Sequence, residues 1–183
     1  MNWSCRARRK SYSNHKTNIP PSLTISINRI FYLCTVKKTI FFNTPPSFKL
    51  NEQDLVDWIY ECVKEKDATI KRLNINFIKE DEMLNLNQRH LKHDNHTDIL
   101  TFSYKDQPII ESEIFISIER ARENAKMYSE TFENETLRLI SHGLLHILGM
   151  KDSTKALKET MVKEEDFFMR KFHVKHARSE KNL

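Results

Sequence analysis

Two histidines and an aspartate are the residues whose types and spacing predict chemistry. Residues 142–152 read HGLLHILGMKD, which sets His142 and His146 four positions apart. Residues at i and i+4 lie on one face of a helix, one turn apart, so two imidazoles can converge on one metal ion. Gly149 suits the left-handed position that ends a helix, and the turn after it can return Asp152 as a third ligand. The spacing predicts a metal site at the C-terminal end of a helix.

Three protein ligands with an open fourth position are typical of a catalytic zinc site, so we expect one Zn²⁺ per chain. The alternative for His142 and His146 is a hydrogen-bonded pair in the core. A zinc protease of the HExxH type needs a glutamate directly after its first histidine as general base, and here that residue is Gly143. Because glycine carries no proton-transfer group, the metal itself must generate the nucleophile or polarise a phosphoryl oxygen.

Glycine is rare in this chain. An average chain of this length holds roughly thirteen glycines. This one holds two, Gly143 and Gly149, and both lie in the histidine segment. We therefore expect that segment to need unusual backbone freedom.

Composition excludes several classes of protein. The mean hydropathy is −0.62, and no apolar stretch is long enough to span a bilayer. The three cysteines are far apart and form no CxxC pair, which argues against a disulfide scaffold or a cysteine zinc site and fits a reducing, cytoplasmic location. The net charge of +5 is unevenly distributed, because residues 1–36 hold six basic and no acidic side chains. Residues 37–183 are therefore close to neutral, and an RNA interface must be argued from local patches.

The pattern along the chain divides it into three parts. Residues 1–36 are basic and without a sustained period, and we interpret them as a disordered extension or as an upstream start that the natural protein does not use. An organelle-targeting peptide is an alternative that their composition allows. Residues 37–172 have the pattern of one domain, which we interpret as a metal-dependent hydrolase domain. Residues 173–183 form a basic tail, and the chain is expected to fray from about residue 170.

The periodicity of residues 37–172 predicts an α+β fold, a small mixed β-sheet packed by about five helices. Strands are expected at residues 39–42, 73–77, 98–104 and 114–117, and helices at 51–66, 81–91, 118–128, 131–148 and 154–172. Thr131, with Glu133 and Glu135 in the first turn, is a suitable N-cap for the helix that carries the histidines.

Several ordered motifs resemble one known family. His142 to Asp152 is similar to the motif HGxLHLxGYDH of the YbeY-type endoribonucleases, which are 16S rRNA maturation factors. Leu86-Asn87, followed by Asp94 and by TDILTF at 97–102, is similar to that family's LN…DxxTDVLSF. SEIFIS at 112–117 resembles its strand GDIxIS, and Met161 with Glu165 falls where its last helix has MxxxE. The resemblance covers about residues 37–172.

This resemblance implies a single-strand-specific, metal-dependent endoribonuclease of the cytoplasm. Its role would lie in 16S rRNA 3′-end maturation and ribosome quality control, its partners would be single-stranded RNA, rRNA and the small ribosomal subunit, and no membrane would be involved. Two alternatives stay open at this point. One is a ribosome-associated assembly factor with a mainly structural metal, and the other is a degenerate zinc protease.

The chain also departs from the family pattern. The family's third histidine is Asp152, and the arginine usually found three residues before Asp94 is Leu91. No protein general base is identified. Candidates to replace that arginine in contacting RNA are Arg89, Lys92 and His93. Four further basic side chains could line a phosphate-binding cleft near the metal, with a solvated helix face as the alternative, namely Arg120, Arg122, Lys126 and Arg138. His93 and His96 are interpreted as residues of a polar loop that could extend the site.

Overall fold

The computed structural model describes residues 38–44, 50–91 and 96–180 of the chain. The elements, in chain order, are β1 (Ile40–Asn43), α2 (Glu52–Lys64), β2 (Thr69–Ile78), α3 (Glu80–Leu91), β3 (Ile99–Ser103), β4 (Ile109–Ser117), α4 (Ile118–Met127), α5 (Phe132–Ile147) and α6 (Lys155–Glu180). They confirm the expected α+β fold with a small mixed sheet and five helices. The expected N-terminal extension, residues 1–36, lies outside the described residues.

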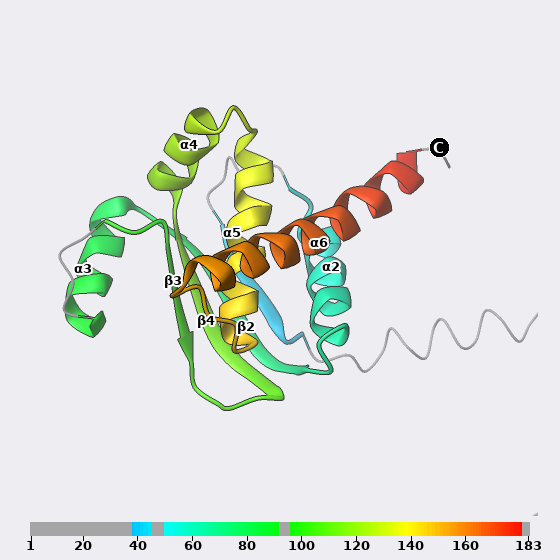
Figure 1. Cartoon of the computed structure of the whole chain (residues 1–183), viewed down its shortest axis with the longest axis horizontal. Coiled ribbons are helices and arrows are strands. Elements are labelled where there is room, and N and C mark those ends of the chain that lie inside the picture. The colour runs from blue at the N-terminus through cyan, green and yellow to red at the C-terminus, as the bar shows by residue number, and fades with distance from the viewer. Residues whose placement is uncertain (1–37, 45–49, 92–95, 181–183) are drawn as a thin grey trace, which may run out of the picture. The chain divides into compact units, whose positions relative to one another are not determined.

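The four strands form one mixed sheet in the order β1-β2-β4-β3 (Figure 1). β1 pairs with β2 and β2 pairs with β4 in parallel. β3 pairs with β4 antiparallel, with Leu100 opposite Phe115 and Thr101 opposite Ile114. β3 is therefore an edge strand of the sheet, and one of its sides carries no further strand among the described residues.

Alternation along β4 decides which face of the sheet the core covers. Ile110, Ile114 and Ile116 are buried, whereas Glu111, Glu113 and Phe115 between them are only partly buried. Successive side chains of a strand point to opposite faces, so the isoleucines face the helical layer. α5 packs on β3 and β4, α2 packs on β2, and α6 lies across α5 and α2 (Figure 1). The buried indole of Trp58 in α2 donates to the carbonyl of Phe168 in α6 at 2.8 Å, which ties those two helices together.

Gly143 lies where α5 approaches the sheet most closely. A Cβ atom there would meet Ile99 Cδ1 at 3.0 Å, Ile114 Cδ1 at 3.1 Å and Thr101 Cγ2 at 3.2 Å. The sequence-based expectation that both glycines need backbone freedom is therefore wrong for Gly143. That glycine sits within α5 and supplies space, because a side chain there would force side chains of β3 and β4 to shift.

Three elements are longer than the sequence pattern predicts, and β2 is one of them, since it begins at Thr69 rather than at residue 73. β4 begins at Ile109 rather than at residue 114, because Ile109 to Ser112 pair with β2 although polar side chains break their apolar alternation. α6 continues to Glu180, where fraying was expected from about residue 170. Neither glycine nor proline occurs in 155–180 to end the helix. None of the helices in the described ranges is both long and apolar enough to cross a membrane.

Candidate metal centre

The last two turns of α5 carry both candidate histidines. Thr131 is the N-cap of this helix, and its hydroxyl accepts the amide N–H of Asn134 at 3.0 Å, as the sequence predicts. His142 and His146 stand one turn apart on the same face, with their ring planes nearly perpendicular and their centroids 4.4 Å apart. Their Nε2 atoms approach to 2.9 Å. The i and i+4 spacing therefore brings two imidazole nitrogens to one point.

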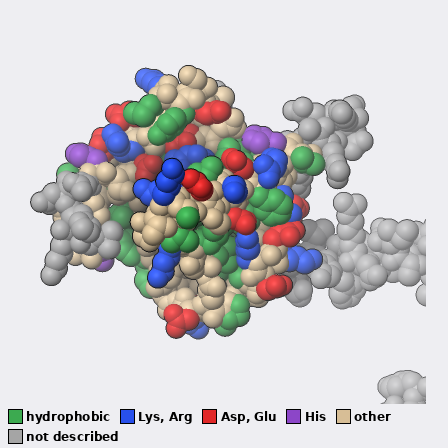
Figure 2. Space-filling view, in the orientation of Figure 1, with side chains coloured by type: hydrophobic (Ala, Val, Ile, Leu, Met, Phe, Trp, Pro, Cys, Tyr) green, Lys and Arg blue, Asp and Glu red, His purple; other side chains and the backbone are tan. Residues whose placement is uncertain are grey.

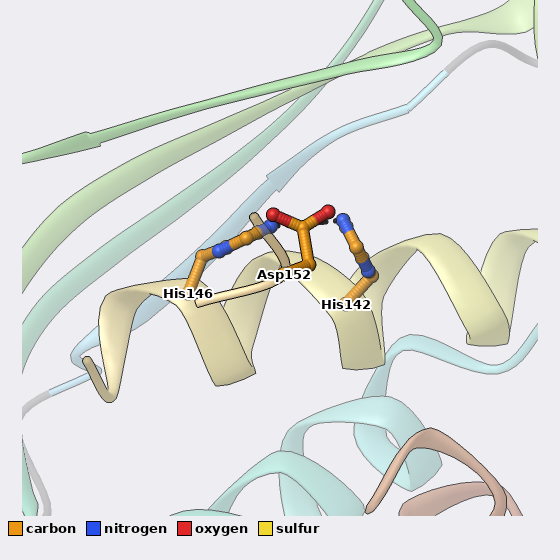
Figure 3. Close-up of side chains that lie close together, drawn as sticks. All are labelled: His142, His146 and Asp152. Carbon is orange, nitrogen blue, oxygen red and sulfur yellow. Dashed lines mark hydrogen bonds between the residues drawn. The ribbon is translucent and has the colours of Figure 1, made fainter. Parts of the chain in front are cut away.

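Gly149 ends α5 in the expected left-handed conformation, with φ of 86°. Its amide donates to the carbonyl of His146 and the amide of Met150 donates to the carbonyl of Leu145, both at 2.9 Å. These two bonds form a Schellman motif, which satisfies the last carbonyls of the helix and reverses the chain. The reversal returns Asp152 over the end of α5 (Figure 3).

Asp152 completes a group of three ligand-type side chains. Its carboxylate lies beside the two imidazoles (Figure 3), and one ligand atom each from His142, His146 and Asp152 falls within 4.8 Å of the others. An aspartate at this position could instead cap the next helix, but Thr154 supplies that cap. The hydroxyl of Thr154 accepts the amide N–H of Leu157, the first-turn bond of a cap on α6.

The hydrogen bonds of the imidazoles favour a cation between them. Nδ1 of His142 lies 2.7 Å from Oε1 of the buried Glu165, and Nδ1 of His146 lies 3.1 Å from the carbonyl oxygen of Met150. Both partners can accept a hydrogen bond, so a proton on each Nδ1 would leave both Nε2 atoms as possible metal donors. The two Nε2 atoms lie 2.9 Å apart, close enough to share a proton or to bind one metal ion. Two imidazole nitrogens and a carboxylate form a donor set that fits Zn²⁺.

A cleft opens in front of the two histidines. It has a volume of about 530 Å³ and is lined by Thr97, Asp98, Ile99, Leu100, Thr101, His142 and His146. One wall is formed by five consecutive residues that lead into β3 and run along it, so the cleft follows this edge strand. No lysine or arginine is among the lining residues that the structure describes. A substrate in this cleft would therefore meet a carboxylate, hydroxyls and the metal-ligand group.

Behind the cleft lies an ion cluster centred on Arg138. Its guanidinium donates twice to Glu135 at 2.8 Å and lies 3.7 Å from Asp98 and 3.6 Å from Glu165. The hydrogen bonds that Arg138 donates to Glu135, reinforced by the charges of all three carboxylates, raise the pKa of Arg138 above its usual range. Asn124 in α4 donates to both Asp98 and Glu135. Arg138 therefore acts first as an internal counterion for the carboxylates around the site.

The other basic candidates lie elsewhere. Arg120 in α4 forms an ion pair with Glu123 at 2.7 Å, and its buried Nε has no hydrogen-bond partner in the described part of the chain. Arg89 is exposed on α3. Lys92, like His93, lies outside the described residues. His96 pairs with Glu80 at 2.7 Å on the surface.

The view that shows α5 and α6 has lysines and arginines interspersed with acidic side chains (Figure 2). No continuous basic patch covers the described part of that face. This mixture agrees with the near-neutral charge of residues 37–183.

Sequence reasoning missed the residues that surround the two histidines. Glu165 is noted only as part of the resemblance to MxxxE, and its contact with His142 spans 23 positions. Asp98 belongs to the motif TDILTF, but its position beside Arg138 of α5 is not encoded there, and Asn124 belongs to no motif. The signal that could have found Glu135 and Glu165 is chemical. Both are acidic residues that lie buried, and buried carboxylates are rare without a partner.

Comparison with known proteins identifies the family of this chain. The family model described as "Endoribonuclease YbeY" matches residues 41–173. An "Endoribonuclease YbeY" of Amoebophilus asiaticus is 38% identical over 131 residues, covering 70% of this chain and 89% of that protein. Another "Endoribonuclease YbeY", from Flavobacterium johnsoniae, is 36% identical over 136 residues, which cover 74% of this chain and 98% of that protein. The fold resembles the solution structure of TM1509 from Thermotoga maritima, with a TM-score of 0.58 and 24% identity over 79% of this chain and 96% of that one. This chain belongs to the YbeY endoribonuclease family.

Proposed function

We propose that this chain is a zinc-dependent endoribonuclease that hydrolyses phosphodiester bonds of single-stranded RNA, in 16S rRNA 3′-end maturation and ribosome quality control. Family membership supports the reaction class. The observation that carries the metal dependence is the convergence of the two Nε2 atoms at 2.9 Å, with Asp152 beside them. We assign one Zn²⁺ per chain to His142, His146 and Asp152, and place the enzyme in the cytoplasm with the small ribosomal subunit as partner.

A zinc ion held by this group would supply Lewis-acid chemistry, activating water at neutral pH and stabilising charge on the phosphoryl group. The side chains of the protein set up that chemistry. Glu165 and the Met150 carbonyl can accept the Nδ1 protons of His142 and His146, which would orient both Nε2 atoms toward the metal. With Zn²⁺ bound, two neutral imidazoles and one carboxylate would leave the centre with a net charge of +1. A positive centre would favour binding of a phosphodiester anion in the cleft.

No observation favours the two alternatives. A zinc protease of the HExxH type requires a glutamate where Gly143 stands, and the Cβ of any residue there would lie 3.0 to 3.2 Å from side chains of β3 and β4. A glutamate at this position would therefore require the side chains of Ile99, Ile114 and Thr101 to shift. An assembly factor with a mainly structural metal has no need for the cleft that opens at His142 and His146.

The test is cleavage of a single-stranded oligoribonucleotide and of its duplex by zinc-loaded and chelator-treated protein. We expect the single strand to be cut, the duplex to resist, and the activity to vanish with the chelator. His146→Ala should abolish both zinc retention and cleavage. Exposed His173 on α6 provides the control, because His173→Ala removes an imidazole elsewhere. Cleavage that survives chelation, or stoichiometric zinc retained by His146→Ala, would overturn the assignment.

We also propose that residues 37–172 hold the complete catalytic domain, with 1–36 as a dispensable extension and 173–183 as a basic tail. A chain that begins at Lys37 should keep its zinc content, its thermal midpoint and its cleavage rate. Loss of soluble protein on this truncation would show that the segment belongs to the domain.

A further inference from the structure

A second hollow lies on the other face of the sheet. Ile114 faces α5, since its Cδ1 approaches Gly143, and the next residue, Phe115, therefore points to the opposite face. There a groove of about 370 Å³ separates α3 from the sheet, lined by Ile78, Glu82, Asn85, Leu86, Arg89 and Phe115. None of these residues lines the metal cleft.

The lining of this groove combines apolar walls with one cation, Arg89, and one carboxylate, Glu82, which stands seven positions earlier on α3. Ile78, Leu86 and Phe115 are each partly exposed, so a flat apolar ligand between them would bury surface that water now contacts. Leu86 and Arg89 stand three positions apart on α3, which puts the guanidinium on the same face of the helix as the apolar wall. Arg89 is exposed, and no carboxylate in the described ranges pairs with it. An apolar slot with a cation beside it matches a nucleotide, which has a flat base and an anionic phosphate.

The ring of Phe115 is held in place by its neighbours. Phe102 in β3 packs edge-to-face against it, with centroids 5.8 Å apart, and His90 in α3 packs in the same manner on Phe102 at 5.1 Å. These edge-to-face contacts restrict the orientation of the Phe115 ring. A restrained aromatic ring loses little conformational freedom when a base stacks on it.

The groove is close to the metal cleft across one strand. Phe115, in the groove wall, is the register partner of Leu100 in the antiparallel pair of β4 and β3. Leu100 itself lines the cleft in front of His142 and His146. Directly opposed residues of antiparallel strands have Cα atoms about 5 Å apart, so only the edge strand β3 separates the two hollows. A strand of RNA bound in the cleft can therefore continue over β3 into the groove.

We propose that this groove binds one unpaired base of the RNA substrate, which stacks on Phe115 while Arg89 contacts an adjoining phosphate. This inference rests on the proposed function and deepens it. A base exposes its full aromatic face to a protein only when it is not stacked within a duplex, so the groove selects single-stranded RNA. Stacking accepts any base, which gives selectivity for strandedness with little selectivity for sequence.

The experiment measures binding without cleavage. Chelator-treated full-length protein is titrated into a fluorescein-labelled oligouridylate and into an abasic ribose-phosphate chain of the same length, and anisotropy is recorded at several salt concentrations. Wild type should bind the oligouridylate more tightly than the abasic chain. Phe115→Leu, which keeps an apolar side chain but removes the ring, should weaken oligouridylate binding about tenfold and leave abasic binding unchanged. Arg89→Gln should weaken both and lower the salt slope by about one.

Two matched variants control for loss of an aromatic ring or of a charge elsewhere. Phe41→Leu changes a partly exposed ring at the opposite edge of the sheet, and Arg170→Gln removes an exposed arginine of α6. Both should bind as wild type does. If Phe115→Leu keeps the full preference for oligouridylate over the abasic chain, or if Phe41→Leu loses it equally, the groove is not the base site. Because binding is read without metal, these outcomes are separate from failure of zinc-dependent cleavage by wild type.

Discussion

Glu165 and His142 come from different helices, and their side chains meet at 2.7 Å inside the protein. Glu165 is 5% exposed, and the guanidinium of Arg138 lies 3.6 Å from its second oxygen. The carboxylate therefore faces the imidazole on one side and a cation on the other. This arrangement keeps the proton of His142 on Nδ1 and leaves Nε2 as the donor to a metal.

Replacing Glu165 tests that relationship. Glu165→Gln keeps the shape and one acceptor oxygen but loses the negative charge, so His142 becomes a weaker ligand. We expect zinc affinity to fall about tenfold or more. The measurement is competition with a chromophoric chelator.

The neighbouring Glu164 offers a matched control. It pairs with Lys66 at 2.7 Å on the surface, and Glu164→Gln should leave zinc affinity unchanged. Equal affinities for both variants and wild type would mean that Glu165 supports only the packing of α6.

Substitutions of Asp152 test whether this residue is a metal ligand or a helix cap. Asp152→Asn should weaken zinc binding, because an amide oxygen carries no formal charge to meet the cation. Asp152→His should preserve binding and move the pH–activity curve to lower pH, since three neutral ligands leave the ion with its full charge. Zinc affinity by chelator competition and initial rates across pH measure the two effects.

Thr154→Ala is the companion variant, because it removes the hydroxyl that accepts the amide of Leu157. It should lower the free energy of unfolding by about 1 kcal/mol and leave zinc affinity unaltered. Unchanged zinc affinity in Asp152→Asn would rule Asp152 out as the third ligand.

The turn at Gly149 should tolerate no ordinary side chain. At φ of 86° an L-residue is strained, and a Cβ atom would lie 2.8 Å from Nε2 of Gln107. Gly149→Ala should therefore lower the free energy of unfolding by more than about 1 kcal/mol. Gly149→Asn should cost less, since asparagine visits the left-handed region more readily. Urea denaturation of zinc-free protein measures the free energy of unfolding of both variants. A Gly149→Ala variant as stable as wild type would contradict the strain predicted at this turn.

Burial of Cys62 predicts a pH dependence of stability. Its thiol is fully buried in α2, and desolvation raises its pKa from 9.0 to about 12. As the pH rises, the unfolded thiol loses its proton before the native thiol does. The contribution of Cys62 to the free energy of unfolding is therefore fully present below pH 9.0 and is lost as the pH rises toward about 12. Native protein at about pH 8 should leave Cys62 unmodified by iodoacetamide, whereas urea-unfolded protein should be alkylated there.

Peptide mass spectrometry locates the modification. Cys62→Ala supplies the reference for the pH series, since its stability should fall less between 9.0 and 12 than that of wild type. Rapid alkylation of Cys62 in the native protein would show that the thiol is accessible.

Local features could be predicted from the sequence because they follow from the helix itself. The spacing of His142 and His146 places both rings on one face in any α-helix, and Thr131 and Gly149 mark the two ends of that helix by backbone chemistry alone. The apolar alternation of Leu73, Ile75 and Phe77 indicates a half-buried strand for the same reason. These signals depend on residues within one or two turns or a few strand positions, so no knowledge of packing is needed.

The surroundings of the site depend on contacts between distant segments, which no local period encodes. Arg138 has the spacing of an exposed helix residue, yet Asp98 from the loop before β3 and Glu165 from α6 make it an internal counterion. The sequence suggests that Gly143 provides backbone flexibility. In the structure its role is to allow close packing, because Ile99 and Ile114 lie against the position of a side chain. The cleft and the groove flank β3 because sheet order makes it an edge strand. Tertiary packing determined these features, since burial and charge pairing depend on which segments meet in space.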